Sequence, residues 1–255
     1  MTQQWHETWR LIKQHGWTLV ALVLLLCIPL LCLDAVAVYL FDLAPDDADK
    51  GDGLLNVMLM PIINGSVVWI VHRGSMGEAA TVWGALRASG SYWSRLFVSY
   101  FGVSLILLAW LVAMVLPAYV VLVVLKIQQL YLLIPFGLAG LLLALPRFAF
   151  IDPLVVIEGL SPFYARQRSA ALVKSRRWMV IRCGAMVYAL PLCLELAGEF
   201  LPGWLGLDQR RGGLGFSLAI SLISALLYIV PIVFFYTYYR AVVPMTAVAA
   251  LKEPL

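Results

Sequence analysis

The chain has 255 residues, of which 63% are hydrophobic and 13% are charged. A soluble domain carries roughly a quarter charged residues, so this composition excludes an ordinary water-facing surface and indicates an integral membrane protein. The net charge of +4 gives no sign of a nucleic-acid partner, and we expect none.

Six apolar segments are long enough to cross a bilayer, whose hydrocarbon core of about 30 Å requires roughly 20 helical residues. In chain order they cover residues 17–41, 54–71, 96–125, 130–157, 179–200 and 214–243. Because backbone polar groups must be satisfied inside lipid, we predict an all-α membrane protein in which the whole chain, 1–255, is a single domain. Pro135, Pro146 and Pro153 in the fourth segment predict a bent or broken helix.

Two intervening segments are too long to be turns, and we predict that they are amphipathic elbow helices near the inner leaflet. The first, 75–94, begins with Ser75-x-x-Glu78, the pattern of a capping box. The second, 161–177, begins with Ser161-Pro162, an N-cap followed by proline at the first helical position. The two stretches share residues at a constant offset, which suggests a parallel internal repeat; chance similarity between two Ala/Ser-rich helices is the alternative.

The basic residues are segregated by loop, which predicts the topology. Of the 18 lysines and arginines, thirteen fall in the termini and in the loops on one side of the expected spans, and four fall in the alternate loops. The positive-inside rule therefore predicts that both termini are cytoplasmic.

The region from residue 145 to residue 176 resembles the signature of a known family. Leu145-Pro146, Glu158-Gly159 and the run Ala165-x2-Arg168-Ser169-x2-Leu172-x-Lys174-x-Arg176 resemble the YciC-like inner-membrane proteins. They are also similar to the membrane domain that precedes some glycerophosphodiester phosphodiesterases. The family is uncharacterised, so the resemblance implies a fold and a location in a bacterial inner membrane rather than a reaction. Extra apolar residues at 117–129 depart from the pattern and leave open how the third and fourth helices connect.

Charged residues in and after the fourth helix are the candidates for binding a lipid or another ligand, because cations near the inner leaflet attract anionic headgroups. These candidates are Arg147, Glu158, Arg166, Arg168, Lys174, Arg176 and Arg177. Arg147 is the strongest, because an ionisable residue inside a membrane segment is costly to keep there. The alternative for Arg147 is an ion pair with Asp152 or a side chain that reaches the interface.

A second group of candidates consists of polar residues inside the expected spans: Asp34, Asn64, Asp152, Glu195 and Glu199. Of these, Asp34, Glu195 and Glu199 could form a proton or cation relay, and solvation at the interface is the alternative. Asn64, beside Gly65, is a candidate polar site in a broken helix. The three histidines and four cysteines lack the spacing of metal ligands, and no catalytic motif occurs, so we expect no metal, no cofactor and no enzyme activity.

We therefore expect a non-enzymatic protein that serves membrane or envelope upkeep through contact with membrane lipids, or by scaffolding a protein partner or a second copy of itself. The alternative is a transporter or channel for a small molecule or lipid, built from two helix–elbow–helix repeats. That alternative requires polar residues of the second, fourth and fifth helices to face one cavity.

Overall fold

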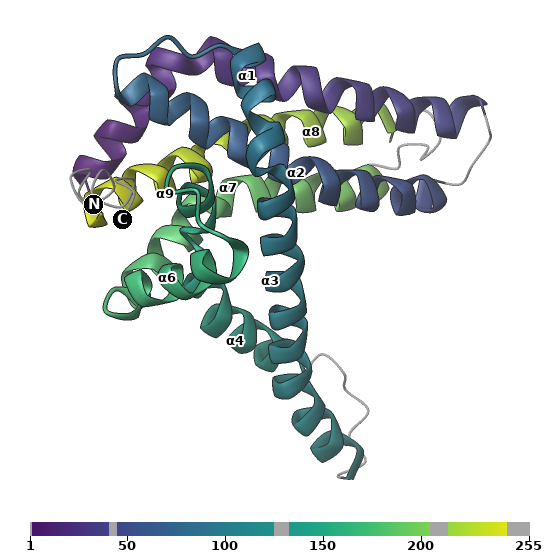
Figure 1. Ribbon diagram of the computed structural model, residues 1–255. Coiled ribbons are helices and arrows are strands. Elements are labelled where there is room, and N and C mark those ends of the chain that lie inside the picture. The colour runs from purple at the N-terminus through teal and green to yellow at the C-terminus, as the bar shows by residue number, and fades with distance from the viewer. Residues whose placement is uncertain (1, 41–44, 125–132, 205–213, 244–255) are drawn as a thin grey trace.

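The computed structural model describes residues 2–40, 45–124, 133–204 and 214–243 (Figure 1). Within these ranges the chain is helical and contains no strand, which confirms the expected all-α class. In chain order the elements are α1 (Thr2–Leu40), α2 (Pro45–Ser75), α3 (Val82–Val124), α4 (Ile134–Ala144), the 3₁₀ helix η2 (Leu145–Phe148), α5 (Ile151–Val156), α6 (Pro162–Lys174), α7 (Arg177–Trp204), α8 (Leu214–Leu227) and α9 (Ile229–Val242).

Among the described residues, five helical stretches are long and apolar enough to cross a membrane: Thr2–Pro29, Val82–Leu122, Pro135–Val156, Arg177–Gly198 and Leu218–Val242. They overlap the first, third, fourth, fifth and sixth expected spans. The second expected span, 54–71, lies in α2 and is not among the five. The structure does not describe the side chains of residues 54–57. In the other expected spans, it does not describe residues 41, 125 and 130–132. The count of six therefore stays a prediction.

The connection between α2 and α3 shows that the expected capping box is wrong. Helix α2 continues to Ser75, whose hydroxyl donates a 2.7 Å hydrogen bond back to the carbonyl oxygen of His72. Gly77 then takes the left-handed conformation, with φ of 79°, which ends the helical path and suits a residue without a Cβ. The Glu78 carboxylate pairs with Arg73 of α2 instead of capping a new helix.

Helix α3 corrects the bounds of the first elbow. It begins at Val82, after Thr81, whose hydroxyl oxygen accepts a 3.1 Å hydrogen bond from the Gly84 N–H and so acts as the N-cap. From there α3 runs without a break to Val124, with Pro117 as its single internal proline. Nothing between residues 94 and 96 interrupts the helix, so the expected elbow 75–94 and the expected span 96–125 share one continuous helix.

The second expected elbow, 161–177, contains a separate helix. Ser161 has an extended backbone (φ −69°, ψ 158°) and Pro162 opens α6, which ends at Lys174 before α7 begins at Arg177. The two stretches of the expected repeat therefore differ locally, because Ser75 closes a helix whereas Ser161 precedes one. The repeat is not confirmed, and a position of α6 at the inner leaflet stays a prediction.

Prolines divide the fourth and sixth expected helices. The fourth becomes α4, η2 and α5, with Pro146 inside the 3₁₀ turn and Pro153 inside α5. The sixth becomes α8 and α9, which meet at Tyr228, three residues before Pro231. Proline lacks the N–H that would bond to the carbonyl four residues earlier, so a helix bends or changes pitch at this position.

Helix α9 forms the centre of the molecule. Nine consecutive residues, 231–239, are buried, and the helix packs against α1, α2, α7 and α8. A helix that is buried on all of its faces must be surrounded by other elements. The core around it includes Leu22 of α1, Val67 of α2 and Phe150 before α5.

The α3–α4 hairpin has a different environment. In Figure 1, α1, α2, α7 and α8 run beside one another, whereas the lower part of α3 and the adjoining α4 extend away from them. The two helices of the hairpin approach closely because Gly137 and Gly140 lack side chains; a Cβ at Gly137 would lie 3.3 Å from Leu111 Cδ1. The most apolar stretch of Val82–Leu122 has no residue buried inside the molecule. This exposed apolar surface fits a helix that faces lipid.

Candidate functional site: a basic pocket beside the proline break

The break between α4 and α5 creates the first part of the site. Pro146 has no N–H and lies in the 3₁₀ turn, so carbonyl groups at the end of α4 lose their regular helical partners. One of them, the carbonyl oxygen of Leu143, accepts a hydrogen bond from the Arg177 guanidinium. This contact brings the first residue of α7 against the end of α4.

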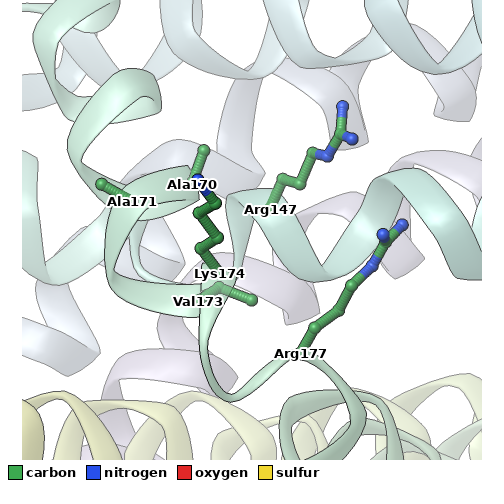
Figure 2. A pocket seen from close by; sticks show the side chains of 6 residues that line it. All are labelled: Arg147, Ala170, Ala171, Val173, Lys174 and Arg177. Carbon is green, nitrogen blue, oxygen red and sulfur yellow. The ribbon is translucent and has the colours of Figure 1, made fainter.

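A pocket of about 340 Å³ lies where η2, α6 and the start of α7 meet. It is lined by Arg147, Ala170, Ala171, Val173, Lys174 and Arg177. Figure 2 shows three basic side chains around it, each from a different element, while alanine and valine supply the remaining lining. The pocket therefore combines three positive charges with a small apolar surface, and none of its lining residues is acidic.

Arg147 does not pair with Asp152, so the pairing considered from the sequence is wrong. Its side chain is exposed, and the guanidinium carbon lies 5.4 Å from the centre of the Trp110 ring of α3. A guanidinium over an indole is held by a cation–π interaction. The stacking positions Arg147 beside the pocket and leaves its N–H groups available to an anion.

Arg177 and Lys174 differ in how they are held. Arg177 Nη2 donates to Leu143, whereas Arg177 Nε is buried and has no hydrogen-bond partner in the protein. Lys174 is exposed at the end of α6. In the part of the chain that the structure describes, no carboxylate forms an ion pair with any of the pocket's three cations. The pocket is thus electropositive, and the Nε–H of one of its lining arginines is buried without a partner.

The other basic candidates do not line this pocket. Arg168 forms a 3.2 Å ion pair with Glu158, whose side chain is only 1% exposed and also accepts a 2.5 Å hydrogen bond from the Tyr239 hydroxyl. Arg166 donates to the carbonyl oxygen of Pro162 and lies against Gly102 of α3. Arg176 is exposed outside the lining. The Arg168–Glu158 pair and the contact of Arg166 with Gly102 therefore hold α6 to the rest of the molecule.

Exposed aromatic rings lie near the basic pocket in the sequence. Trp178 follows Arg177 and is 71% exposed, and Phe163 and Tyr164 at the start of α6 are 57% and 63% exposed. Large exposed aromatic rings beside basic residues are typical of the membrane–water interface, where the ring meets the headgroup layer. Exposed aromatic rings therefore occur at the start of α6 and at the start of α7, the two helices that contribute Lys174 and Arg177 to the pocket.

Two of the intramembrane candidates meet through a residue that the sequence did not single out. Asn64 of α2 donates a 2.8 Å hydrogen bond to the Tyr100 hydroxyl, which donates a 2.5 Å bond to Asp152 of α5. Glu195 lies elsewhere, near Tyr228 and Ser224 at the α7–α8 contact. A tyrosine inside an apolar run carries a hydroxyl that needs a partner, and this is the signal that identifies Tyr100. The side chains of Asp34 and Glu199 lie outside the described residues.

We examined whether the described residues could bind a metal ion and whether the chain is similar to known proteins. Over the described ranges, no group of three or more His, Cys, Asp or Glu side chains is arranged to hold a metal ion. No protein-family profile, no curated protein and no solved structure matches the chain.

Proposed function

We propose that this chain is a multi-span membrane protein that binds the phosphate of an anionic lipid headgroup in the basic pocket. The observation that carries the proposal is the meeting of Arg147, Lys174 and Arg177 around one pocket without an acidic neighbour. Arginine N–H groups match phosphate oxygens in geometry, and lysine adds a mobile point charge. The unpartnered Nε–H of Arg177 is the type of donor that a phosphate oxygen would satisfy.

The position of the pocket favours a lipid over a dissolved anion. It lies between two candidate spans, Pro135–Val156 and Arg177–Gly198, and the exposed Trp178 ring is next to it in the chain. The phosphate of a lipid is already concentrated at the membrane surface, where we propose that the pocket lies. Each cation near an anionic leaflet contributes about 1 kcal/mol to binding.

The basic pocket and the distribution of basic residues also suggest a cellular role. We propose a bacterial inner-membrane protein with six spans, both termini in the cytoplasm and a YciC-like fold, which acts without catalysis. Its role would be membrane or envelope upkeep through lipid contact or the scaffolding of a partner. The support is the bias of basic residues toward one set of loops and the gathering of three of them at the pocket.

The test is a lipid-retention measurement on the purified full chain by native mass spectrometry. The protein is offered chain-matched phosphatidylglycerol and phosphatidylcholine. We expect the wild type to retain phosphatidylglycerol preferentially, and Arg147→Gln/Lys174→Gln to bind it roughly 30-fold more weakly, which corresponds to two contributions of about 1 kcal/mol. Arg177 is left unchanged because it also holds the Leu143 carbonyl.

The matched control is Lys13→Gln/Arg87→Gln, which removes one lysine and one arginine from exposed positions on α1 and α3. This control should retain phosphatidylglycerol like the wild type. Equal losses in the two double variants would overturn the proposal, because net charge rather than the pocket would then set the affinity. Displacement of the lipid by a small excess of inorganic phosphate would also overturn it, since the pocket would then be a site for the free anion.

A further inference from the structure

A second polar group lies apart from the basic pocket, at the meeting of three helices. Asn64 of α2 donates to the Tyr100 hydroxyl of α3 at 2.8 Å, and that hydroxyl donates to Asp152 Oδ1 of α5 at 2.5 Å. The bonds run in one direction, from amide to phenol to carboxyl. We propose that Asp152 is a proton-binding site within the membrane, which takes a proton from water to become a neutral carboxylic acid and returns it on ionisation.

The surroundings of Asp152 supply no positive charge. Within the described part of the molecule, no lysine, arginine or histidine forms an ion pair with it. Arg147, five residues earlier, is stacked on Trp110. From α6, which packs against α5, Arg166 is directed to the carbonyl oxygen of Pro162 and lies against Gly102. An ionised Asp152 would therefore be an anion without a counter-charge.

The groups that do face Asp152 are neutral. Helix α3 contributes the Tyr100 phenol, α2 contributes the Asn64 amide through that phenol, and the Tyr188 phenol of α7 lies within electrostatic range. The neighbouring residues on α5, Ile151, Leu154 and Val155, are buried and apolar.

Binding of a proton removes the uncompensated negative charge of Asp152. Keeping an unpaired carboxylate inside a candidate membrane span is costly, and such a group is neutralised instead. The neutral acid still accepts the Tyr100 hydrogen bond at its carbonyl oxygen, so all three helices keep their contact. Because ionisation leaves the same two hydrogen bonds in place, the proton can bind and leave without breaking the connection between α2, α3 and α5.

The experiment is infrared spectroscopy of the full chain reconstituted in lipid, recorded from about pH 5 to about pH 9. We expect the carbonyl stretch of a protonated carboxylic acid at low pH, its loss with rising pH, and its absence in Asp152→Asn. The isosteric amide keeps an acceptor for Tyr100. Glu195→Gln, which removes a carboxylate at the α7–α8 contact, should retain the band.

A second variant makes the result independent of how well Asp152→Asn folds. Tyr100→Phe removes the hydrogen bond to Asp152 and should shift the carbonyl band to higher frequency. An unchanged band in both Asp152→Asn and Tyr100→Phe would overturn the proposal. So would a band whose titration shifts when sodium replaces potassium, because the site would then bind a metal cation. The inference does not depend on lipid binding at the basic pocket, whose variants should leave the band unchanged.

Discussion

Arg177, the first residue of α7, donates a hydrogen bond to the carbonyl oxygen of Leu143 near the end of α4, 34 residues earlier in the chain. The bond crosses the proline break and fixes where α7 begins relative to η2. The contact lies beside the basic pocket, because Arg177 lines it together with Arg147 of η2, which follows α4, and Lys174 of α6, which precedes α7.

We predict that Arg177→Met lowers the stability of the protein by about 1.5–3 kcal/mol, the usual contribution of a hydrogen bond from a charged group. Methionine keeps an unbranched apolar stem but leaves the Leu143 carbonyl without its donor. The measurement is thermal unfolding in detergent, followed by circular dichroism. Arg182→Met, at an exposed position on the same helix, is the control, and equal losses in the two variants would contradict the assigned role.

The contact between α1 and α2 leads to a prediction at Gly74. A Cβ at this position would overlap the His15 imidazole, so we expect Gly74→Ala to destabilise the protein by about 1–3 kcal/mol through overpacking. Gly90→Ala is the control, because no atom lies within 4 Å of its added Cβ and alanine favours a helix by about 1 kcal/mol over glycine. The stability of both variants can be compared by thermal unfolding.

A double variant tests the cause at Gly74. If the imidazole is the obstacle, His15→Ala should make Gly74→Ala nearly harmless, since the smaller side chain leaves room for the added methyl group. Additive losses in the double variant would show that the cost of Gly74→Ala has another origin.

The buried carboxylate of Glu158 gives a third prediction. Glu158→Gln keeps an acceptor for Tyr239 but removes the charge that pairs with Arg168. Because the Arg168 side chain is partly exposed, we expect a loss of about 1–2 kcal/mol rather than the larger cost of a fully buried pair. Glu78→Gln removes a charge from the exposed pair with Arg73 and should cost less than about 1 kcal/mol. Equal decreases in the unfolding temperature of Glu158→Gln and Glu78→Gln would contradict the structural role of Glu158.

The sequence predicts those parts of the fold that depend on local chemistry. Long apolar runs indicate helices, Pro146 indicates the break in the fourth helix, and Ser161-Pro162 marks the start of α6. In each case the controlling property, such as a missing N–H or a fixed φ, belongs to the residue itself.

The first elbow shows where local patterns are insufficient. Ser75 and Glu78 have capping-box spacing, but α2 extends through Ser75 and Thr81 provides the cap for α3. A capping pattern identifies a residue that is able to begin a helix. It does not determine whether a neighbouring helix, packed against the core, will extend over that residue first.

The residues that line the basic pocket could not be identified from the sequence pattern alone, because they are brought together by tertiary packing. Seven charged residues were candidates at the fourth helix and the second elbow, and three of them line the pocket. Arg168 lies on the same short helix as Lys174, yet it pairs with Glu158, which in turn accepts a hydrogen bond from Tyr239. Which side chain meets a distant partner depends on the packing of α6 against η2, α5 and α7, and helical periodicity specifies only the face of each helix.

The most direct test of lipid binding uses phosphatidylglycerol with a photoactivatable group on its headgroup, added to the full chain in a bilayer. Crosslinked peptides are identified by mass spectrometry. We predict that the main adducts fall on residues 170–178, around Lys174 and Arg177, and disappear in Arg147→Gln/Lys174→Gln. Adducts spread equally over other exposed basic positions, such as Lys13 and Arg87, and unchanged in that variant, would contradict the account.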